Sequence, residues 1–193
     1  MPHKRLFIPG PTEVRSENLA ALAKPQIGHR GDEFKDLYTR VVPKLQQLLE
    51  TKDPVFLFTC SSTGVWEAAI RNSVKDRVLC CMQGAFSDRW LKVAESNGKE
   101  AVPLKVEWGK AITAEAIDKE LSKGGYDAIT VVHNETSTGV LNRLDEIAAV
   151  LRKYPDVSFL VDAVSSMAGV RIPVDEWRID VCLAGLQKAF ALP

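Results

Sequence analysis

Six short apolar runs alternate with more polar segments from residue 55 onward. They occupy residues 55–59 (VFLFT), 77–82 (RVLCCM), 101–107 (AVPLKVE), 127–133 (DAITVVH), 157–163 (VSFLVDA) and 179–185 (IDVCLAG). Runs of this length that are apolar on both faces are typical of strands buried inside a parallel sheet. The pattern therefore predicts six strands.

The segments between these runs carry the spacing of helices. Apolar side chains recur three and four residues apart in two stripes, one at Leu144, Ile147, Ala148 and Leu151 and a shorter one at Trp66, Ala69 and Ile70. A right-handed crossover between parallel strands lays a helix on one face of the sheet or the other. The predicted fold class is therefore α/β, a mostly parallel sheet with helices on both faces.

The chain before residue 54 has a different pattern. PGPT at 9–12 is turn-forming, and residues 32–50 are predicted to be a helix that Pro43 kinks or divides. Because no repeat or linker is present, we expect a single domain over residues 1–193, in which residues 1–53 lead into a sheet domain at 54–193. An apolar run at 179–185 lies so close to Pro193 that we expect the natural domain to continue beyond it.

Composition removes several classes of partner. Lysine plus arginine and aspartate plus glutamate number 25 each, so no broad charge favours nucleic acid or an anionic membrane. No stretch approaches the roughly 20 apolar residues of a membrane span, and the start lacks the apolar core of a signal peptide. We infer an intracellular protein, cytoplasmic by default. We expect buried, reduced thiols and no metal site, since no paired spacing links the cysteines at positions 60, 80, 81 and 182.

Chemically informative residues follow the apolar runs, where an open parallel sheet collects its ligands. Ser61, Ser62 and Thr63 open a helix and form a candidate phosphate cradle, although such residues also cap helices without any ligand. Asp162 ends one run and Lys188 follows the last. Taken singly, each is more often solvated or paired with a neighbour. Together they meet the needs of a pyridoxal ring, because an amine condenses with its aldehyde and a carboxylate keeps its nitrogen protonated.

Several segments resemble one enzyme family in the order in which they occur. They are PGPT at 9–12, GHR at 28–30, SSTGVWEA at 61–68, HNETSTGVL at 133–141, VDAVSS at 161–166 and GLQKA at 185–189. Their sequence is similar to the N-terminal half of the class V pyridoxal-phosphate-dependent aminotransferases, in particular the alanine–glyoxylate and serine–pyruvate branch. The resemblance implies the large domain of fold type I, pyridoxal 5'-phosphate as cofactor, and a homodimer.

The resemblance also implies residue roles. Lys188 would form a Schiff base with the cofactor, and Asp162 would pair with the pyridine nitrogen. Phe86 would stack on one face of the ring and Val164 would pack on the other. The remaining cofactor contacts that it implies are Ser61, Ser62, Thr63 and Gln187 at the phosphate and Thr136 near the phenolic oxygen. The family usually has glycine where this chain has Ser62 and often serine where it has Leu186.

The implied reaction moves an amino group from a small amino acid, alanine or serine, to glyoxylate or another 2-oxo acid. Lys188 would take the substrate α-proton and return it, acting as base and acid. The family's arginine for the substrate carboxylate lies in the C-terminal portion. We therefore expect this chain alone to be incomplete and to need that half of the enzyme.

Three alternatives remain open. A class V cysteine desulfurase or lyase is one, although desulfurases typically carry histidine at the positions of Gln187 and Phe86. A non-catalytic partner subunit is another, although Asp162 and Lys188 are retained. A nucleotide-binding Rossmann domain is the third, although CSSTG at 60–64 does not supply the glycine pattern GxGxxG. His29 and His133 are interpreted as hydrogen-bonding loop residues.

Overall fold

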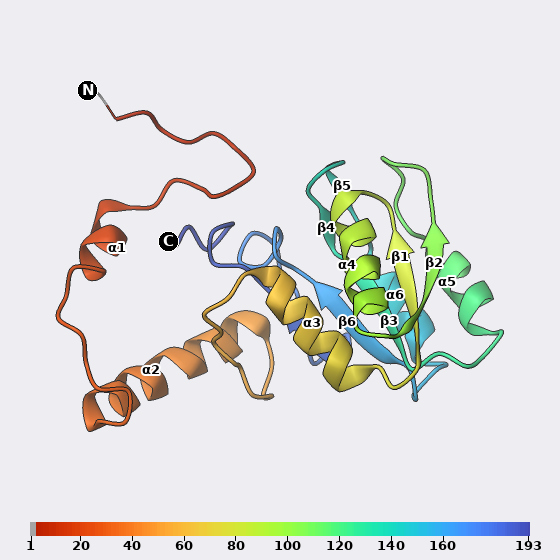
Figure 1. Cartoon of the computed structure of the whole chain (residues 1–193), viewed down its shortest axis with the longest axis horizontal. Coiled ribbons are helices and arrows are strands. Elements are labelled where there is room, and N and C mark those ends of the chain that lie inside the picture. Colours follow the sequence, from red (N-terminus) through yellow and green to blue (C-terminus); the bar gives the residue numbers. More distant parts are fainter. Residues whose placement is uncertain (1–2) are drawn as a thin grey trace.

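The computed structural model describes residues 3–193, whose main feature is a five-stranded sheet in the order β2-β1-β3-β6-β7 (Figure 1). Every neighbouring pair of strands is parallel. The strands are β1 (Arg77–Met82), β2 (Glu100–Lys105), β3 (Ala128–Val132), β6 (Ser158–Asp162) and β7 (Val181–Leu183). Five of the six predicted strands and the predicted α/β class are therefore confirmed.

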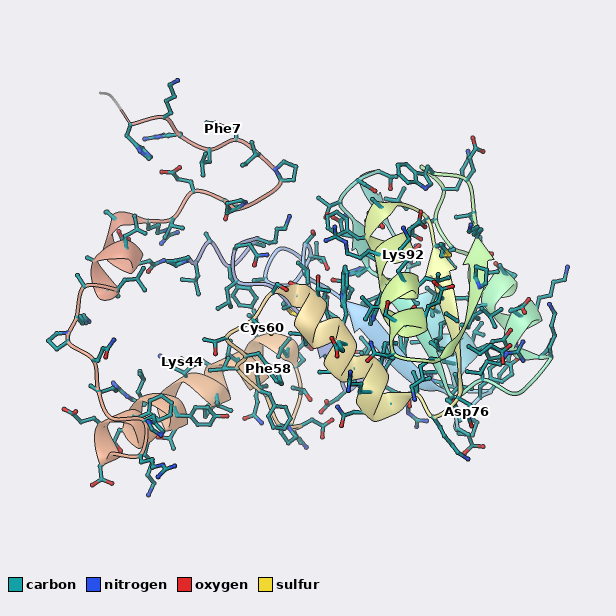
Figure 2. The ribbon with its side chains drawn as sticks, in the orientation of Figure 1. Phe7, Lys44, Phe58, Cys60, Asp76 and Lys92 are labelled. Carbon is teal, nitrogen blue, oxygen red and sulfur yellow. The ribbon has the colours of Figure 1, made fainter. Side chains whose placement is uncertain are left out.

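The sixth predicted strand, residues 55–59, is wrong. This segment is not a strand and pairs with no strand of the described chain, so its apolar side chains stay in solvent, with Phe56 71% and Phe58 57% exposed. Apolar residues form a strand only where a partner takes their backbone hydrogen bonds. Figure 2 shows Phe58 and Cys60 outside the sheet, on the segment between helices α2 and α3.

The cysteines are all free thiols, but the expectation that all four are buried is also wrong. Cys60 follows the unpaired segment and is exposed, whereas Cys80 and Cys81 are buried within β1 and Cys182 is half-buried in β7. Burial raises the pKa of Cys80 to about 11 and that of Cys182 to about 12. These two thiols therefore stay protonated and unreactive near neutral pH.

Helices cover both faces of the sheet, as expected. Helices α3 (Ser62–Ser73) and α4 (Ala85–Ser96) pack on one face, and α5 (Ala114–Leu121) and α6 (Leu144–Leu151) pack on the other. Strand β1 serves both layers, because Val78, Cys80 and Met82 join the first core and the alternate residues Leu79 and Cys81 join the second. The residues of both predicted apolar stripes are buried.

Helices α1 (Ser16–Ala21) and α2 (Asp32–Leu49) contain no buried residue, and most of their length lies outside this sandwich (Figure 1). The C-terminal end of α2 reaches it, where half-buried Leu49 packs against the second core. Helix α2 runs through Pro43 as one element, so Pro43 does not divide the helix, whereas the alternative of a kink there stays a prediction. Proline removes a hydrogen bond to the carbonyl four residues earlier, that of Thr39, but this residue is exposed and water can replace the lost donor. Among the helices of residues 3–193, none has the length and hydrophobicity of a membrane span.

Two short antiparallel strands, β4 (Asn134–Glu135) and β5 (Val140–Leu141), form a hairpin that follows β3. The hairpin turns through Gly139, whose φ of 75° lies in the left-handed region that glycine adopts without strain. Because β3 ends at Val132, the hairpin begins at the carboxyl edge of the sheet. It therefore brings polar residues to the edge where the sequence places the chemistry.

Candidate functional site

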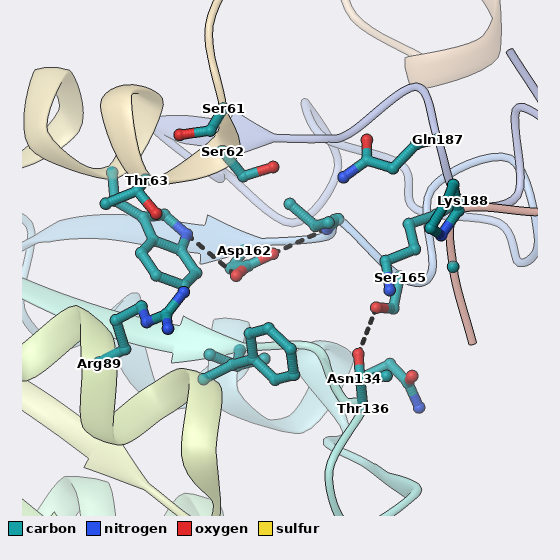
Figure 3. Close-up of a pocket in the computed structure, with 16 residues that line it drawn as sticks. Ser61, Ser62, Thr63, Arg89, Asn134, Thr136, Asp162, Ser165, Gln187 and Lys188 are labelled. Carbon is teal, nitrogen blue, oxygen red and sulfur yellow. Dashed lines mark hydrogen bonds between the residues drawn. The ribbon is translucent and has the colours of Figure 1, made fainter. Parts of the chain in front are cut away.

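A pocket of about 260 Å³ lies at the carboxyl ends of the strands (Figure 3). All nine residues that the sequence singled out line it, namely Ser61, Ser62, Thr63, Phe86, Thr136, Asp162, Val164, Gln187 and Lys188. They come from segments far apart in the chain. The parallel topology explains their meeting, since it delivers the carboxyl ends of all strands to one edge.

Asp162 is the last residue of β6 and lies at the base of the pocket, 3% exposed. Its Oδ1 accepts a 2.7 Å hydrogen bond from the backbone N–H of Val164, and its Oδ2 accepts a 3.0 Å bond from the indole N–H of Trp66. Burial raises the pKa of Asp162 from 3.8 to about 6, and the two donors oppose that rise. A positively charged neighbour would lower this pKa and favour the ionised carboxylate.

Lys188 lies in the turn that follows β7, where its Nζ donates a 2.9 Å hydrogen bond to the carbonyl of Pro9. The turn at residues 9–12 is tied to the lysine segment a second time, because the Thr12 N–H donates to the Gln187 carbonyl at 3.0 Å. Gly10 permits this approach, since a Cβ there would lie 2.7 Å from Lys188 Cδ. The N-terminal turn therefore forms one wall of the pocket and holds the amine.

Ser61, Ser62 and Thr63 form the first turn of α3 and face the pocket. Ser61 is the residue that precedes the helix, yet its side chain makes no capping hydrogen bond, and no acidic side chain lies in the first turn. The alternative that these residues only cap the helix is therefore not supported. Free N–H groups and the positive end of the helix dipole make this turn suited to an anion.

Phe86 reaches the pocket from the start of α4, and buried Glu135 fixes that start. The Glu135 carboxylate accepts hydrogen bonds from the backbone N–H groups of Phe86 at 3.3 Å and Ser87 at 3.1 Å. Gly84 allows the contact, because a Cβ there would lie 2.5 Å from Glu135 Cγ. The hairpin thereby sets the position of the aromatic ring.

Two hydroxyls and a histidine organise the opposite wall. Thr136 and Ser165, both at the pocket, share a hydrogen bond between their Oγ atoms (Figure 3). His133 Nδ1 and Ser166 Oγ share a hydrogen bond of 2.9 Å, and burial lowers the pKa of His133 to about 4. His133 is thus neutral near pH 7 and has the hydrogen-bonding role expected from the sequence, outside the pocket lining.

Sequence reasoning did not assign seven other residues that line the pocket, which are Gly10, Pro11, Trp66, Arg89, Val132, Asn134 and Ser165. Helical spacing carries a signal for two of them. Trp66 lies three residues after Thr63, and Arg89 lies three residues after Phe86, so each shares a helix face with a residue already assigned to the site. The turn at residues 9–12 carries part of the family resemblance, but nothing local in the sequence shows that it contacts Lys188.

The class-V aminotransferase family model matches residues 12–193 of this chain. The chain belongs to the class V aminotransferases. This confirms the resemblance that its motifs carry.

Individual relatives agree with the assignment. The class V chain is 42% identical over 195 residues to an uncharacterized aminotransferase of Methanocaldococcus jannaschii, covering 98% of this chain and 50% of that protein. It is 36% identical over 199 residues to the L-aspartate–glyoxylate aminotransferase of Paracoccus denitrificans, covering 97% of this chain and 49% of that protein. The class V chain thus spans about half the length of the curated relatives it matches.

The fold agrees as well. The crystal structure of alanine–glyoxylate aminotransferase from Nostoc sp. matches with a TM-score of 0.94 and 28% identity, over 100% of this chain and 52% of that chain. The class V chain therefore has the fold type I architecture expected from the sequence.

Proposed function

We propose that the pocket binds pyridoxal 5'-phosphate and that the chain forms the cofactor-binding part of an aminotransferase. The observation that carries the proposal is that a buried carboxylate, a lysine amine and a helix start with free hydroxyls line one pocket, as Asp162, Lys188 and Ser61 to Thr63 do. We also infer that residues 54–193 form the cofactor-binding domain and that residues 1–53 lead into it.

The side chains fit the chemistry of the cofactor. Lys188 supplies the amine for a covalent bond to the aldehyde carbon, and Asp162 supplies an acceptor for a protonated ring nitrogen. The turn at residues 61–63 and Gln187 would hold the phosphate, Thr136 would hydrogen-bond the phenolic oxygen, and Phe86 and Val164 would enclose the flat ring. When bound, pyridoxal phosphate supplies an electron-withdrawing ring that stabilises negative charge at the substrate α-carbon.

Two side chains then act on the reaction. The Lys188 amine would take a proton from the substrate α-carbon and return it at the cofactor carbon. Before substrate binds, this amine donates a hydrogen bond to the Pro9 carbonyl. Asp162 acts electrostatically. A protonated ring nitrogen beside it would favour the ionised carboxylate, and the negative carboxylate would in turn favour the protonated nitrogen. Loss of Asp162 should therefore impair the chemical step more than the binding of substrate.

For the substrates, we infer alanine or serine as amino donor and glyoxylate or another 2-oxo acid as acceptor. The names of two relatives support glyoxylate as acceptor, because one is an aspartate–glyoxylate and the other an alanine–glyoxylate aminotransferase. We further infer a homodimer, and that the substrate carboxylate is bound by residues of the C-terminal half that the longer relatives contain.

The cofactor site can be tested by mass. The purified chain is incubated with pyridoxal phosphate, reduced with borohydride and digested, and we expect a phosphopyridoxyl group on Lys188. Lys188→Ala should remove this group and the matching absorption band. Lys92→Ala, a change at an exposed lysine on α4, should leave both intact. A group spread over several surface lysines, or an unchanged spectrum in Lys188→Ala, would overturn the proposal.

The reaction can be tested by offering alanine, serine, aspartate and cysteine with glyoxylate. Formation of glycine identifies amino transfer and the donor. Release of sulfide from cysteine would instead identify a desulfurase. Cofactor fixed on Lys188 without turnover of any substrate, even after the C-terminal half is added, would identify a non-catalytic partner subunit.

A further inference from the structure

We propose that Trp66 is a positioning residue for Asp162, holding the carboxylate by its indole N–H in the orientation that presents it to the pocket. The inference rests on the proposed function, because it is the cofactor ring that the carboxylate would meet. It concerns a residue that the sequence assigned only to the apolar stripe of a helix.

The first observation is that Asp162 is held at both oxygens by different parts of the fold. The backbone N–H of Val164 donates to Oδ1 at 2.7 Å, and the Trp66 indole donates to Oδ2 at 3.0 Å (Figure 3). One donor alone would let the carboxylate rotate about its Cβ–Cγ bond. Two donors on separate oxygens fix the plane of the group, so the remaining lone pairs have a fixed direction.

The second observation is that Trp66 itself is held by close packing. Its side chain is 2% exposed and stacks on Trp90, with ring centroids 5.8 Å apart and planes at 18°. Trp66 lies on α3, which begins at the turn of residues 61–63, and Trp90 lies on α4, which begins beside Phe86. The stacked pair therefore ties the orientation of Asp162 to the two helices that carry the candidate phosphate and ring contacts.

The third observation distinguishes the two tryptophans. Trp90 is fully buried, and its indole N–H has no hydrogen-bond partner among residues 3–193. Tryptophan offers a single donor, and leaving it unpaired in a core is unfavourable. Two stacked indoles thus occupy the same core, but only the one on α3 directs its donor to the carboxylate.

The surroundings of Asp162 raise its pKa, and the Trp66 donor opposes that rise. Burial is the main cause that raises the pKa of Asp162, and Glu135 adds to the rise, whereas Val164, Trp66 and Lys188 lower it. The ionisable groups that face or adjoin Asp162 are Arg89 on α4, His133 after β3, Glu135 on β4, Cys182 on β7 and Lys188 after it. Without the indole N–H, the carboxyl would hold its proton to higher pH and would present a donor where an acceptor is needed.

The pair supplies its own matched variants for a test. Trp66→Phe removes the donor to Asp162 and keeps an aromatic ring for the stack, and Trp90→Phe removes a donor that has no partner. The protonation of Asp162 is followed in the cofactor-free chain by the infrared band of the protonated carboxyl, assigned with Asp162→Asn. We expect Trp66→Phe to bind this proton roughly tenfold more tightly, the effect of losing one hydrogen bond to a charge, and Trp90→Phe to titrate like the unchanged protein.

A measurement on the unchanged protein guards against a variant that fails to fold. The indole N–H resonance of Trp66, assigned by its absence in Trp66→Phe or by its persistence in Trp90→Phe, should shift through the titration of Asp162 while that of Trp90 stays constant. The proposal is overturned if the Trp66 resonance does not respond, or if the two phenylalanine variants change the carboxyl titration equally.

The cofactor arm separates this inference from the proposed function. Trp66→Phe should weaken binding of pyridoxal phosphate about tenfold while Trp90→Phe leaves it unchanged, as measured by absorption at increasing cofactor concentration. If the unchanged chain fixes no phosphopyridoxyl group on Lys188, the proposed function fails, yet the infrared result still decides the role of Trp66. If the cofactor binds equally well to both variants, the positioning role fails and the proposed function stands.

Discussion

Replacement of Asp162 by asparagine should change how the stability of the cofactor-free chain depends on pH. The pKa of Asp162 rises from 3.8 to about 6 on folding, because the carboxylate loses water. A group whose pKa is raised on folding stabilises the native state fully below its unfolded pKa, and this contribution is lost as pH rises through the folded pKa. The difference of about two pKa units corresponds to about 3 kcal/mol, lost mainly between pH 4 and pH 6.

Asparagine cannot ionise, so the variant should not show this loss. It has only one oxygen, whereas Val164 and Trp66 donate to two, so one donor is left facing an amide N–H. That mismatch costs about 1–3 kcal/mol and does not depend on pH. The informative quantity is therefore the difference in unfolding free energy between the variant and the unchanged chain. This difference should shift by about 3 kcal/mol in favour of the variant from pH 3 to pH 8.

Urea unfolding, followed by circular dichroism at intervals of pH, measures this difference. Asp127→Asn is a control of opposite sign. Burial favours the protonated form there too, but the N–H groups of Asp76 and Arg77 outweigh it and keep the pKa of Asp127 low. The stability lost by Asp127→Asn should thus appear as pH rises toward about 4 and stay constant above it, because a pKa lowered on folding stabilises the native state fully above the unfolded pKa. A difference for Asp162→Asn that is flat across the range, or that shifts against the variant, would refute the assignment of a destabilising buried carboxylate.

Three further changes test other parts of the structure. Glu135→Gln should lower the unfolding free energy by about 2 kcal/mol and weaken pyridoxal phosphate binding, because the carboxylate accepts a hydrogen bond from the Ser87 N–H at the start of α4. Denaturant unfolding measures the first effect and absorption titration with the cofactor measures the second. Ile147→Ala, at a fully buried position of α6, should cost about 2–5 kcal/mol in denaturant unfolding. Gly10→Ala should reduce the phosphopyridoxyl group found on Lys188 after borohydride reduction, because its Cβ would lie 2.7 Å from Lys188 Cδ and alanine rarely adopts the φ of 145° found there.

The sheet and the position of the site could be predicted because both follow from local patterns and a general rule. Runs such as residues 128–132 are apolar on both faces. This pattern is typical of a strand that is covered on both sides of the sheet, as β3 is. The carboxyl-edge rule then brings together Asp162 and Lys188 without any knowledge of their contacts. The same local logic failed at residues 55–59, because whether an apolar run pairs depends on a neighbour that the run does not contain.

The contacts that shape the site could not be predicted for a related reason. Trp66 has the spacing of a core residue, and only the packing of α3 over β6 shows that its polar atom reaches Asp162. Glu135 lies in a motif-like segment, but its partners are backbone N–H groups of a helix about 50 residues earlier, and backbone groups leave no trace in a sequence. A side chain that acts on another element's backbone therefore has to be found in three dimensions.

Helices α1 and α2 contain no buried residue, whereas every buried residue of the described chain lies at Trp66 or beyond. A helix with little packed surface gains little stability from the core, and its amide protons exchange readily with solvent. We therefore expect brief digestion with a dilute protease to cut within residues 3–60 and to spare the remainder. Deuterium uptake should divide the chain at the same place, fast before α3 and slow in β1, β3 and β6.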